Sequence, residues 1–392
     1  MTSPQVTYVM PGKVGGVVTI IDNLLRFRRP DNFSYNAVLT FNRHDPDTRF
    51  TGALAVDAQT TFEHALPIEN IHAVARRLRA AIGSASGVLV CNDALEMMMA
   101  ALVDPGRTVV QILHQDTEYY YDLATRHEPL VHAFVAYSRR MYENLLARMP
   151  QRRDSIFWLP YGVVIPEKVR VPSSSGPLRM VYAGRLDEAK GVLDLPALDD
   201  ALLRRGTNVV WTIIGNGPSA DRLWTQWTRS SRVQWVPNAT STQVVSACAD
   251  HDVFVLPSRV EGLSVATVEA MSAGLVPVVT RLPSMCEIVE DNRTGVLVDV
   301  GDVEAFADAV ARLDRDRDRL NTMSCAARSL IAERFDIRDR AAGYQNLFSR
   351  WRELHRPRPA TMPISYGSRL DRPWLPNPLV RLVRSTLRSK HR

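Results

Sequence analysis

Short apolar runs alternate with amphipathic segments along nearly the whole chain, and this alternation constrains the fold more than any other feature. The apolar runs, for example residues 87–91 and 253–256, have the length and the β-branched content of buried strands. The segments between them repeat apolar residues at helical spacing. Strands that alternate with helices build parallel sheets covered by helices, so the sequence predicts an α/β fold with doubly wound parallel sheets.

The alternation stops once and then restarts. In the first half, strands are predicted at residues 6–10, 37–41, 87–91, 109–113 and 134–137, and helices at 17–27, 68–82 and 139–147. In the second half, strands are predicted at residues 178–183, 209–214, 233–236, 253–256, 277–280 and 296–298, and helices at 193–203, 265–272 and 303–313. Between the halves, residues 169–177 are rich in Ser, Gly and Pro, which is typical of a linker.

A chain of 392 residues is long enough for two domains at roughly 150 residues per domain. We therefore predict a Rossmann-like N-terminal domain at residues 1–168, a linker at 169–177 and a second Rossmann-like domain that begins at residue 178. Ligands of open parallel sheets bind beyond the carboxyl ends of the strands. Two such domains that face each other would form a ligand-binding cleft.

Several classes of protein are excluded by composition. The longest apolar runs fall well short of the ~18 residues that span a bilayer, and the N-terminus has neither the basic start nor the apolar core of a signal peptide. We therefore expect a cytoplasmic protein. The four cysteines are too far apart for a Cys-x-x-Cys pair, which argues against a zinc site, a redox motif or a disulfide framework.

Positive charge is concentrated at the C-terminus. The chain carries a net charge of +6, but residues 351–392 hold ten Lys or Arg and only two Asp or Glu. The preceding 350 residues therefore carry 38 basic and 40 acidic groups. Because this body is not basic and has no stripe of basic and aromatic residues, we expect no nucleic-acid partner.

The tail at residues 357–392 is rich in proline and ends in a predicted basic amphipathic helix. At 100° per residue, one face of this helix holds Leu379, Val380, Leu382, Val383 and Leu387, and the opposite face holds Arg381, Arg384 and Arg388. Such a helix can lie on an anionic membrane surface, or its apolar face can pack on the protein itself or on a second subunit. The sequence leaves these alternatives and the oligomeric state open.

Two glycine-rich turns are candidate phosphate sites. The strand at residues 6–10 leads through Lys13, Gly15 and Gly16 into a helix, which places a cation and free backbone N–H groups together. The second turn, residues 215–220, fits the dinucleotide pattern G-x-G-x-x-A. However, no acidic residue for a ribose ends the following strand at residues 233–236. We therefore interpret the second turn as a tight turn and reject a dehydrogenase.

The most informative stretch is residues 253–277. A buried strand is followed by a polar turn with Glu261 and Gly262, and then by a helix that opens near Ser264 and carries Glu269. The free N–H groups of Leu263, Ser264 and the residue after them would point at a ligand over the helix start, and a diphosphate fits there. The alternative is that neither glutamate binds a ligand. Glu261 would then be an acidic residue favoured by the helix dipole, and Glu269 a solvated glutamate on the helix surface.

In this stretch the chain resembles retaining glycosyltransferase family 4, the nucleotide-sugar-dependent enzymes of GT-B fold. The family's two glutamates separated by seven residues match Glu261 and Glu269, and an Ala-Gly-x-Pro-Val-Val run follows at residues 273–279 with one extra residue. Further matching motifs are residues 182–191, which hold Arg185 and Lys190, and residues 213–218, 287–298 and 159–163. The glycine loop, His114 and Ser138 occupy the family's positions in the first half.

The resemblance implies a role for each matching residue. Arg185 and Lys190 would stabilise the charge that develops on the β-phosphate, with Gly15 and Gly16 closing over the phosphates. Glu269 would hold the ribose, and Glu261, assisted by Gly262, Leu263 and Ser264, would hold the transferred sugar. His114 would approach the donor sugar; the alternative is a core histidine bonded to the backbone. We accordingly predict Glu261, His114, Arg185 and Lys190 as catalytic.

The resemblance also implies domain boundaries and an activity. The nucleotide-sugar-binding domain would span residues 178–335, and a helix at 336–356 would cross back to the N-terminal domain. We expect a retaining transferase that moves a sugar from a UDP- or GDP-linked donor to a glycan, lipid-linked or small-molecule acceptor in bacterial envelope or polysaccharide synthesis. It needs no cofactor besides this substrate. Alternatives are a GT-B epimerase or phosphorylase and a non-catalytic nucleotide-sugar-binding subunit.

We expect no metal site. Asp-x-Asp pairs, which hold the metal of GT-A transferases, occur at Asp45–Asp47 and within Asp314–Asp318. The first pair lies in a polar loop and the second in a stretch rich in Arg and Asp, so both are interpreted as solvated surface.

Overall fold

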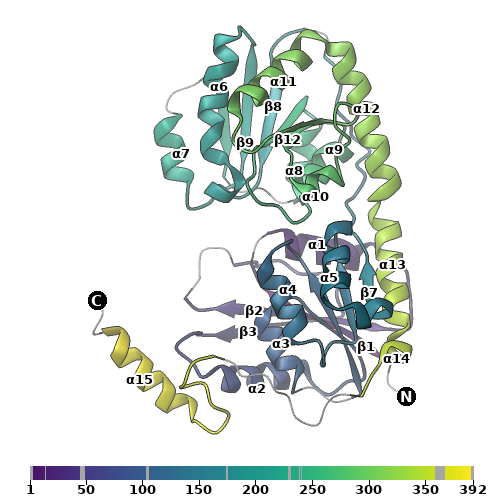
Figure 1. Ribbon diagram of the computed structural model, residues 1–392, viewed down its shortest axis with the longest axis vertical. Helices are drawn as coiled ribbons and strands as arrows, with labels where there is room; N and C mark the ends of the chain where they lie inside the picture. Colours follow the sequence, from purple (N-terminus) through teal and green to yellow (C-terminus); the bar gives the residue numbers. More distant parts are fainter. Residues whose placement is uncertain are drawn as a thin grey trace. The chain divides into compact units, whose positions relative to one another are not determined.

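A computed structural model describes residues 3–13, 15–44, 49–102, 106–173, 175–227, 231–237, 239, 241–357 and 367–389. The chain forms two compact units, which Figure 1 shows with their element labels. Unit 1 comprises residues 1–160 and 340–392, and unit 2 comprises residues 161–339. Unit 2 is therefore inserted into the sequence of unit 1.

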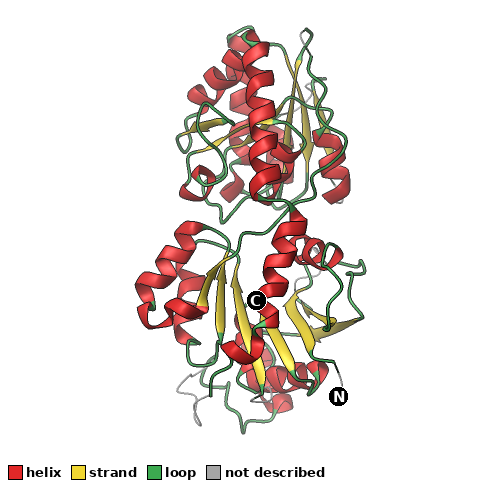
Figure 2. Ribbon diagram, turned by 90° about the vertical axis from the view of Figure 1, so that its right-hand side faces the viewer, coloured by secondary structure: helices red, strands yellow, loops and turns green. Residues whose placement is uncertain are grey.

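Unit 1 is built on a parallel sheet, which has seven strands within the described residues, in the order β3-β2-β1-β4-β5-β6-β7. Its strands are β1 (Gln5–Pro11), β2 (Ser34–Asn42), β3 (Ala58–His64), β4 (Gly87–Cys91), β5 (Arg107–Leu113), β6 (Ala133–Ala136) and β7 (Ile156–Trp158). Its helices are α1 (Gly16–Arg26), α2 (Ile71–Ile82), α3 (Ala94–Ala100), α4 (Glu118–Arg126), α5 (Arg139–Arg148), the 3₁₀ helix η1 (Pro150–Ser155), α14 (Trp351–Leu354) and α15 (Asn377–Ser389). The central strands are buried on both faces, since helices lie on both sides of the sheet (Figure 2).

Unit 2 repeats this architecture with a parallel sheet that has six described strands, in the order β10-β9-β8-β11-β12-β13. Its strands are β8 (Leu178–Ala183), β9 (Val209–Ile214), β10 (Val233–Val236), β11 (Val253–Leu256), β12 (Val276–Thr280) and β13 (Val296–Val298). Its helices are η2 (Glu188–Lys190), η3 (Val192–Asp194), α6 (Leu195–Arg204), α7 (Ala220–Gln226), α8 (Ser241–Cys248), α9 (Val265–Ser272), α10 (Pro283–Cys286), α11 (Val303–Arg315) and α12 (Arg317–Arg334). The predicted α/β fold with two doubly wound parallel sheets is confirmed.

The segment between the two sheets belongs to unit 2. The change of unit falls at Pro160, ahead of the predicted linker at 169–177. The reason lies in Arg170, whose backbone N–H donates to Ala273 and whose Nε donates to Asp252 at 2.9 Å. Asp252 is completely buried and also accepts two hydrogen bonds from the Arg179 guanidinium. This buried charge cluster fixes the segment to the start of β11, because an unpaired buried carboxylate would be costly.

Helix α13 (Ile337–Ser349) carries the chain from unit 2 back into unit 1. In unit 1 its Tyr344 hydroxyl donates to the carbonyl oxygen of Leu159 at 2.9 Å, and Phe348 packs edge-on against Tyr8 of β1. After α14 the described chain resumes at residue 367 and ends in α15, where the amphipathic helix was predicted. In the part of the chain that is described, no helix combines the length and the hydropathy that crossing a membrane requires.

Candidate functional site

The strand order of unit 2 reverses between β8 and β11. From β8 the chain continues to β9 and β10 on one side, and β11 begins the other side. In this class of sheet, the loops that follow two such strands leave in opposite directions, and ligands bind in the crevice between them at the carboxyl edge. Arg185 and Lys190 follow β8, whereas Glu261 and Gly262 follow β11. The predicted residues of unit 2 thus gather where this class of sheet binds ligands.

The two loops are bonded directly to each other. The N–H group of Arg259 donates to the carbonyl oxygen of Ala189 at 2.8 Å. Next to it, Gly191 has a φ of 66°, and a Cβ atom at this position would lie 1.9 Å from the carbonyl oxygen of Pro257. Only glycine combines this left-handed conformation with such a close approach. The turn that carries Lys190 is therefore held against the end of β11.

Lys190 and Glu261 form an ion pair across this junction. The Lys190 Nζ atom lies 2.7 Å from Glu261 Oε1, and the Ser258 hydroxyl donates to the same oxygen at 2.8 Å. The Glu261 side chain is 6% exposed. The structure thus brings together two residues that the sequence placed on different groups of the donor, and their contact holds a cation and a carboxylate ready at one point of the crevice.

Arg185 lies in the same loop as Lys190, directly after β8. Its guanidinium forms an ion pair with Asp187, and about two thirds of its side chain is exposed to solvent. The Asp187 carboxylate also caps η2 by accepting a hydrogen bond from the Lys190 N–H at 3.1 Å. The Arg185 backbone is fixed as well, because the Tyr182 hydroxyl donates to its carbonyl oxygen at 2.8 Å. Arg185 is therefore a solvent-accessible cation on a fixed backbone.

The loop after Glu261 forms the start of α9. Ser264 is the N-cap, and its hydroxyl accepts a hydrogen bond from the Thr267 N–H at 3.3 Å. The carbonyl oxygen of Leu263 accepts a hydrogen bond from Tyr161 at 2.8 Å. Glu269 is buried in the first turns of α9, so its interpretation as a solvated helical glutamate is wrong.

In unit 1 the glycine loop follows β1. Helix α1 begins at Gly16, and its N-cap Gly15 provides no side chain to bond the first N–H groups. Lys13 precedes them on the solvent-exposed part of the loop. The loop is held by its own backbone, since Gly12 donates to Thr40 and accepts from Phe50, each at 2.8 Å. These groups have the composition of an anion site.

His114 lies at the carboxyl end of β5 and is bonded to Asn92, which sequence reasoning missed. The Asn92 amide donates to the carbonyl oxygen of Val9 at 2.7 Å, so its oxygen faces the His114 Nε2 atom, also at 2.7 Å. Nε2 must then carry the proton, and Nδ1 is left as an acceptor. Nδ1 is buried without a hydrogen-bond partner among the described residues. The alternative interpretation of His114 as a core histidine bonded to the backbone is therefore wrong as well.

Burial sets the protonation of this cluster. It lowers the pKa of His114 to about 3, so the ring is neutral at physiological pH. Burial also raises the pKa of Glu96 well above its ordinary value, with the charge of Asp93 adding to the effect. Glu96 accepts hydrogen bonds from the N–H groups of Asn92 and Asp93, as in a capping box at the start of α3. The Asp-x-x-Glu spacing directly after a buried strand was the signal that could have indicated Asn92.

The turn at Gly215–Gly217 follows β9, the neighbour of β8 in the sheet. A Cβ atom at residue 215 would lie 2.0 Å from the carbonyl oxygen of Gly184, and one at residue 217 would lie 2.4 Å from that of Leu186. Close packing of two strand ends thus accounts for both glycines without a bound dinucleotide. Beside it, the Trp235 indole donates to the Gly215 carbonyl oxygen at 2.9 Å and is 41% exposed.

Of the two Asp-x-Asp motifs, only the one at Asp314–Asp318 lies within the described residues. Asp45 and Asp47 lie outside the described residues. Asp314 forms an ion pair with Arg317, and Asp316 caps α12 through the N–H of Arg319. Within the described ranges, no three His, Cys, Asp or Glu side chains are grouped as a metal site would need.

The fold and the site together define the GT-B class. Both sheets have the strand order 3-2-1-4 at their centre, and unit 2 gathers cations and carboxylates at its reversal point. The chain is similar in structure to Alr3699/HepE of Anabaena, solved in complex with UDP and glucose, with a TM-score of 0.68. The alignment covers 88% of this chain and 99% of that protein at 17% sequence identity. The predicted GT-B fold is confirmed.

Sequence comparison shows which family unit 2 resembles. Residues 177–316 match the family described as glycosyl transferases group 1. The chain is 32% identical over 170 residues to the putative colanic acid biosynthesis glycosyltransferase WcaL of Salmonella typhimurium. This alignment covers 41% of this chain and 42% of that protein. It is 26% identical over 350 residues to the GDP-mannose:cellobiosyl-diphosphopolyprenol alpha-mannosyltransferase of Xanthomonas campestris. This alignment covers 80% of this chain and 89% of that protein. The first match thus spans about two fifths of the relative. The family resemblance of the second-unit motifs is confirmed.

Proposed function

We propose that this protein transfers a sugar from a nucleoside diphosphate donor to a glycan or lipid-linked acceptor, with retention of anomeric configuration and without a metal ion. The observation that carries the proposal is the meeting of Lys190 and Glu261 at the strand reversal of unit 2, 2.7 Å apart. A leaving diphosphate needs a cation, and a transferred sugar needs a carboxylate for its hydroxyls. The crevice holds both.

The surrounding groups fit the remaining parts of the donor. Arg185 is accessible to a phosphate, and a planar guanidinium binds phosphate through two parallel hydrogen bonds. The start of α9 offers N–H groups to the same diphosphate. The exposed face of Trp235 suits stacking of a base, which contributes about 1–3 kcal/mol. Glu269, buried in α9, is assigned to the ribose.

The relatives support the class of substrate. The Anabaena structure contains UDP and glucose, and the Xanthomonas relative is named for GDP-mannose and a diphosphopolyprenol acceptor. We therefore assign a UDP- or GDP-linked donor to this chain, and an acceptor of bacterial envelope or polysaccharide synthesis. In unit 1, neutral His114 is assigned to the donor sugar, where its Nδ1 can accept a hydrogen bond.

The test is a thermal-shift panel of UDP- and GDP-linked sugars, followed by a transfer assay with and without EDTA. A ligand at 100 times its dissociation constant adds about 2.7 kcal/mol, or roughly 5–10 °C for a unit of this size. We expect one donor to give this shift and to release its nucleoside diphosphate only when an acceptor is present. Phosphate-dependent release would indicate a phosphorylase, and binding without turnover would indicate a non-catalytic subunit. Loss of activity in EDTA would refute metal independence.

A further inference from the structure

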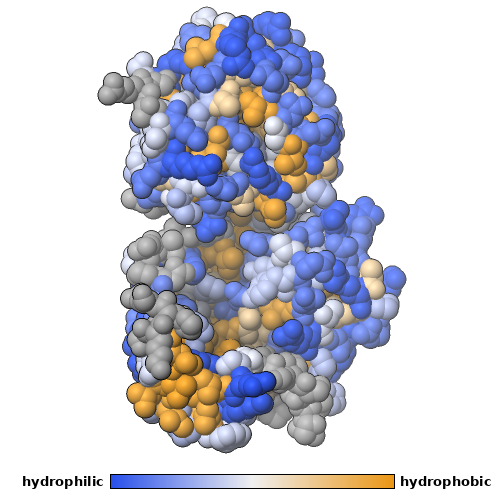
Figure 3. Space-filling model, turned by 60° about the vertical axis from the view of Figure 1, so that its left-hand side comes forward, coloured by the Kyte–Doolittle hydropathy of each residue, from blue (hydrophilic) through white to orange (hydrophobic). Residues whose placement is uncertain are grey.

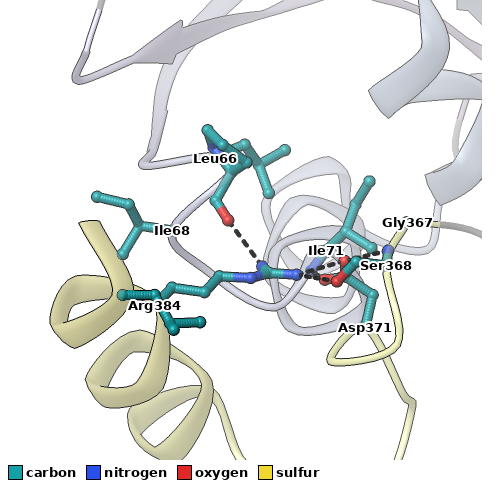
Figure 4. A pocket seen from close by; sticks show the side chains of 9 residues that line it. Leu66, Ile68, Ile71, Gly367, Ser368, Asp371 and Arg384 are labelled. Carbon is teal, nitrogen blue, oxygen red and sulfur yellow. Dashed lines mark hydrogen bonds and ion pairs between the residues drawn. The ribbon is translucent and has the colours of Figure 1, made fainter. Parts of the chain in front are cut away.

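Helix α15 is fixed to unit 1 along one edge of its surface. Val380 is completely buried there. The Arg384 guanidinium donates to the carbonyl oxygens of Pro67 and Glu69, each at 2.7 Å, and to the Asp371 carboxylate at 2.6 Å. Figure 4 shows Arg384 reaching from α15 to Asp371 with Leu66 and Ile68 on the other side. The anchor thus comes from Arg384, a residue of the predicted basic face.

The anchor is well supported by backbone groups. Asp371 is 6% exposed and accepts hydrogen bonds from the N–H groups of Ile71 at 3.0 Å and Ser368 at 2.8 Å. Burial raises the pKa of Asp371, but these bonds and the one from Arg384 outweigh it and hold the pKa below its ordinary value. At the other end of α15, Asn377 accepts a hydrogen bond from the Asn70 N–H at 2.8 Å. The rotation of α15 about its own axis is therefore fixed.

In this orientation α15 leaves a leucine strip in solvent, formed by Leu379, Leu382 and Leu387. These side chains are 48%, 64% and 53% exposed. Figure 3 shows hydrophobic side chains gathered at the lower left of the molecule, where Figure 1 places α15. Three large apolar side chains exposed within three helical turns mark an interaction surface.

A pocket of about 450 Å³ continues this apolar surface beside the helix. Leu387 of the strip lines it together with Leu66, Ile68 and Ile71, which lie on the segment that enters α2. Arg384 crosses it to Asp371 (Figure 4). The apolar area therefore extends from α15 onto the body of unit 1.

The charge around the strip indicates its partner. Arg369, Arg372 and Arg381 are exposed on the same tail, as is Trp374, which is 76% exposed. Residues 351–392 hold ten basic and two acidic residues, while the rest of the chain is slightly acidic. An apolar strip flanked by arginines and a tryptophan complements a surface with acyl chains beneath anionic head groups.

We propose that the leucine strip and the adjoining pocket bind the surface of an anionic phospholipid bilayer. A helix of 13 residues is about 20 Å long, so α15 would lie in the plane of the interface, with its leucines at the head-group boundary and its arginines against phosphates. Through Arg384 this contact holds unit 1 at the membrane. The proposal does not depend on the transferase activity, because bilayer binding is measured without a donor.

The experiment is co-sedimentation of the full chain with vesicles of phosphatidylcholine and phosphatidylglycerol, and with phosphatidylcholine alone. We expect binding to the anionic vesicles, at least about tenfold weaker binding after the combined changes Leu379→Gln, Leu382→Gln and Leu387→Gln, and about fivefold weaker binding for Arg381→Gln. The matched control is Leu203→Gln on α6, which removes a leucine that is 52% exposed in unit 2. It should bind like the wild type.

Other outcomes overturn the proposal. If the wild type ignores anionic vesicles, or the combined variant binds them equally, the strip is not a bilayer site. A wild-type dimer that the combined variant converts to a monomer, without vesicle binding, would assign the strip to a second copy of the chain. Should the combined variant melt lower than the wild type, Leu382→Gln alone, the most exposed position of the strip, must still weaken vesicle binding. If the protein binds vesicles but no nucleotide sugar raises its melting temperature, only the proposed transferase function is refuted.

Discussion

The Lys190–Glu261 ion pair should appear as a coupling free energy in the ligand-free protein. Its atoms lie 2.7 Å apart, and the Lys190 and Glu261 side chains are 31% and 6% exposed. A hydrogen bond to a charged group contributes about 1.5–3 kcal/mol, whereas an exposed ion pair contributes about 0.2–1 kcal/mol. Because Glu261 is buried and Lys190 is partly screened by solvent, we expect a coupling free energy of about 1–2 kcal/mol between them.

The measurement is a double-mutant cycle of Lys190→Ala, Glu261→Ala and the double variant in denaturant. Tryptophan fluorescence reports mainly on unit 2, because Trp211, Trp224, Trp227 and Trp235 belong to it and the chain has seven tryptophans. Lys190→Ala should lower the free energy of unfolding more in the wild type than in the Glu261→Ala background. In the wild type the change leaves the buried Glu261 carboxylate without its ion-pair partner.

A matched cycle on Arg204, the last residue of α6, and Glu304, in the first turn of α11, serves as the control, because these side chains are 61% and 59% exposed. We expect less than about 0.5 kcal/mol there. If Lys190 and Glu261 couple no more strongly than this control, the two loops do not meet as described, and the reasoning that places a cation and a carboxylate at one point fails.

Three further predictions concern the site. Arg185→Ala should lower turnover roughly 10²–10³-fold, the scale of one lost donor at developing charge, while Arg204→Ala keeps wild-type turnover; equal rates would remove Arg185 from the phosphate site. Glu269→Ala should weaken binding of the free nucleoside diphosphate, whereas Glu261→Ala spares it and impairs transfer; calorimetry with equal affinities in both variants would contradict the assignment. Because the folded pKa of His114 is about 3 and the unfolded value is ~6.5, the unfolded chain binds a proton that the folded one does not between these values. Stability should therefore fall with pH below ~6.5, and His114→Gln should reduce that slope by up to about 1.4 kcal/mol per pH unit in chemical unfolding; an unchanged slope would contradict the buried neutral ring.

The sequence predicted the strands of unit 2 closely because they are apolar runs between clear turns. The strands at 178–183, 209–214, 233–236 and 253–256 were placed at their observed bounds. In unit 1 the prediction missed β3, whose first four residues are exposed and polar or small, as an edge strand permits. It also missed the whole of α12, whose N-cap Asp316 lies in a stretch interpreted as surface.

Contacts between residues far apart in the sequence could not be predicted from motif spacing. Lys190 and Glu261 are 71 positions apart, and only the order of β8 and β11 in the sheet brings their loops together. Asn92 and His114 follow neighbouring strands, but their bond depends on the orientation of one amide. Helical periodicity placed Arg384 on the basic face, but in the structure it lines the same pocket as Leu387. Periodicity also could not show that its partners include backbone oxygens of unit 1.

The insertion of unit 2 into unit 1 sets the order in which a ribosome can complete them. Residues 161–339 leave the ribosome before residues 340–392, so unit 2 has its whole sequence while unit 1 still lacks part of its own. The missing part includes Phe348, which packs on Tyr8 of the central strand, and Asn377 and Arg384, which bond the start of α2. Unit 1 is thus begun before unit 2 and completed after it, and the surfaces that Phe348, Asn377 and Arg384 contact stay unpaired until this segment is synthesised.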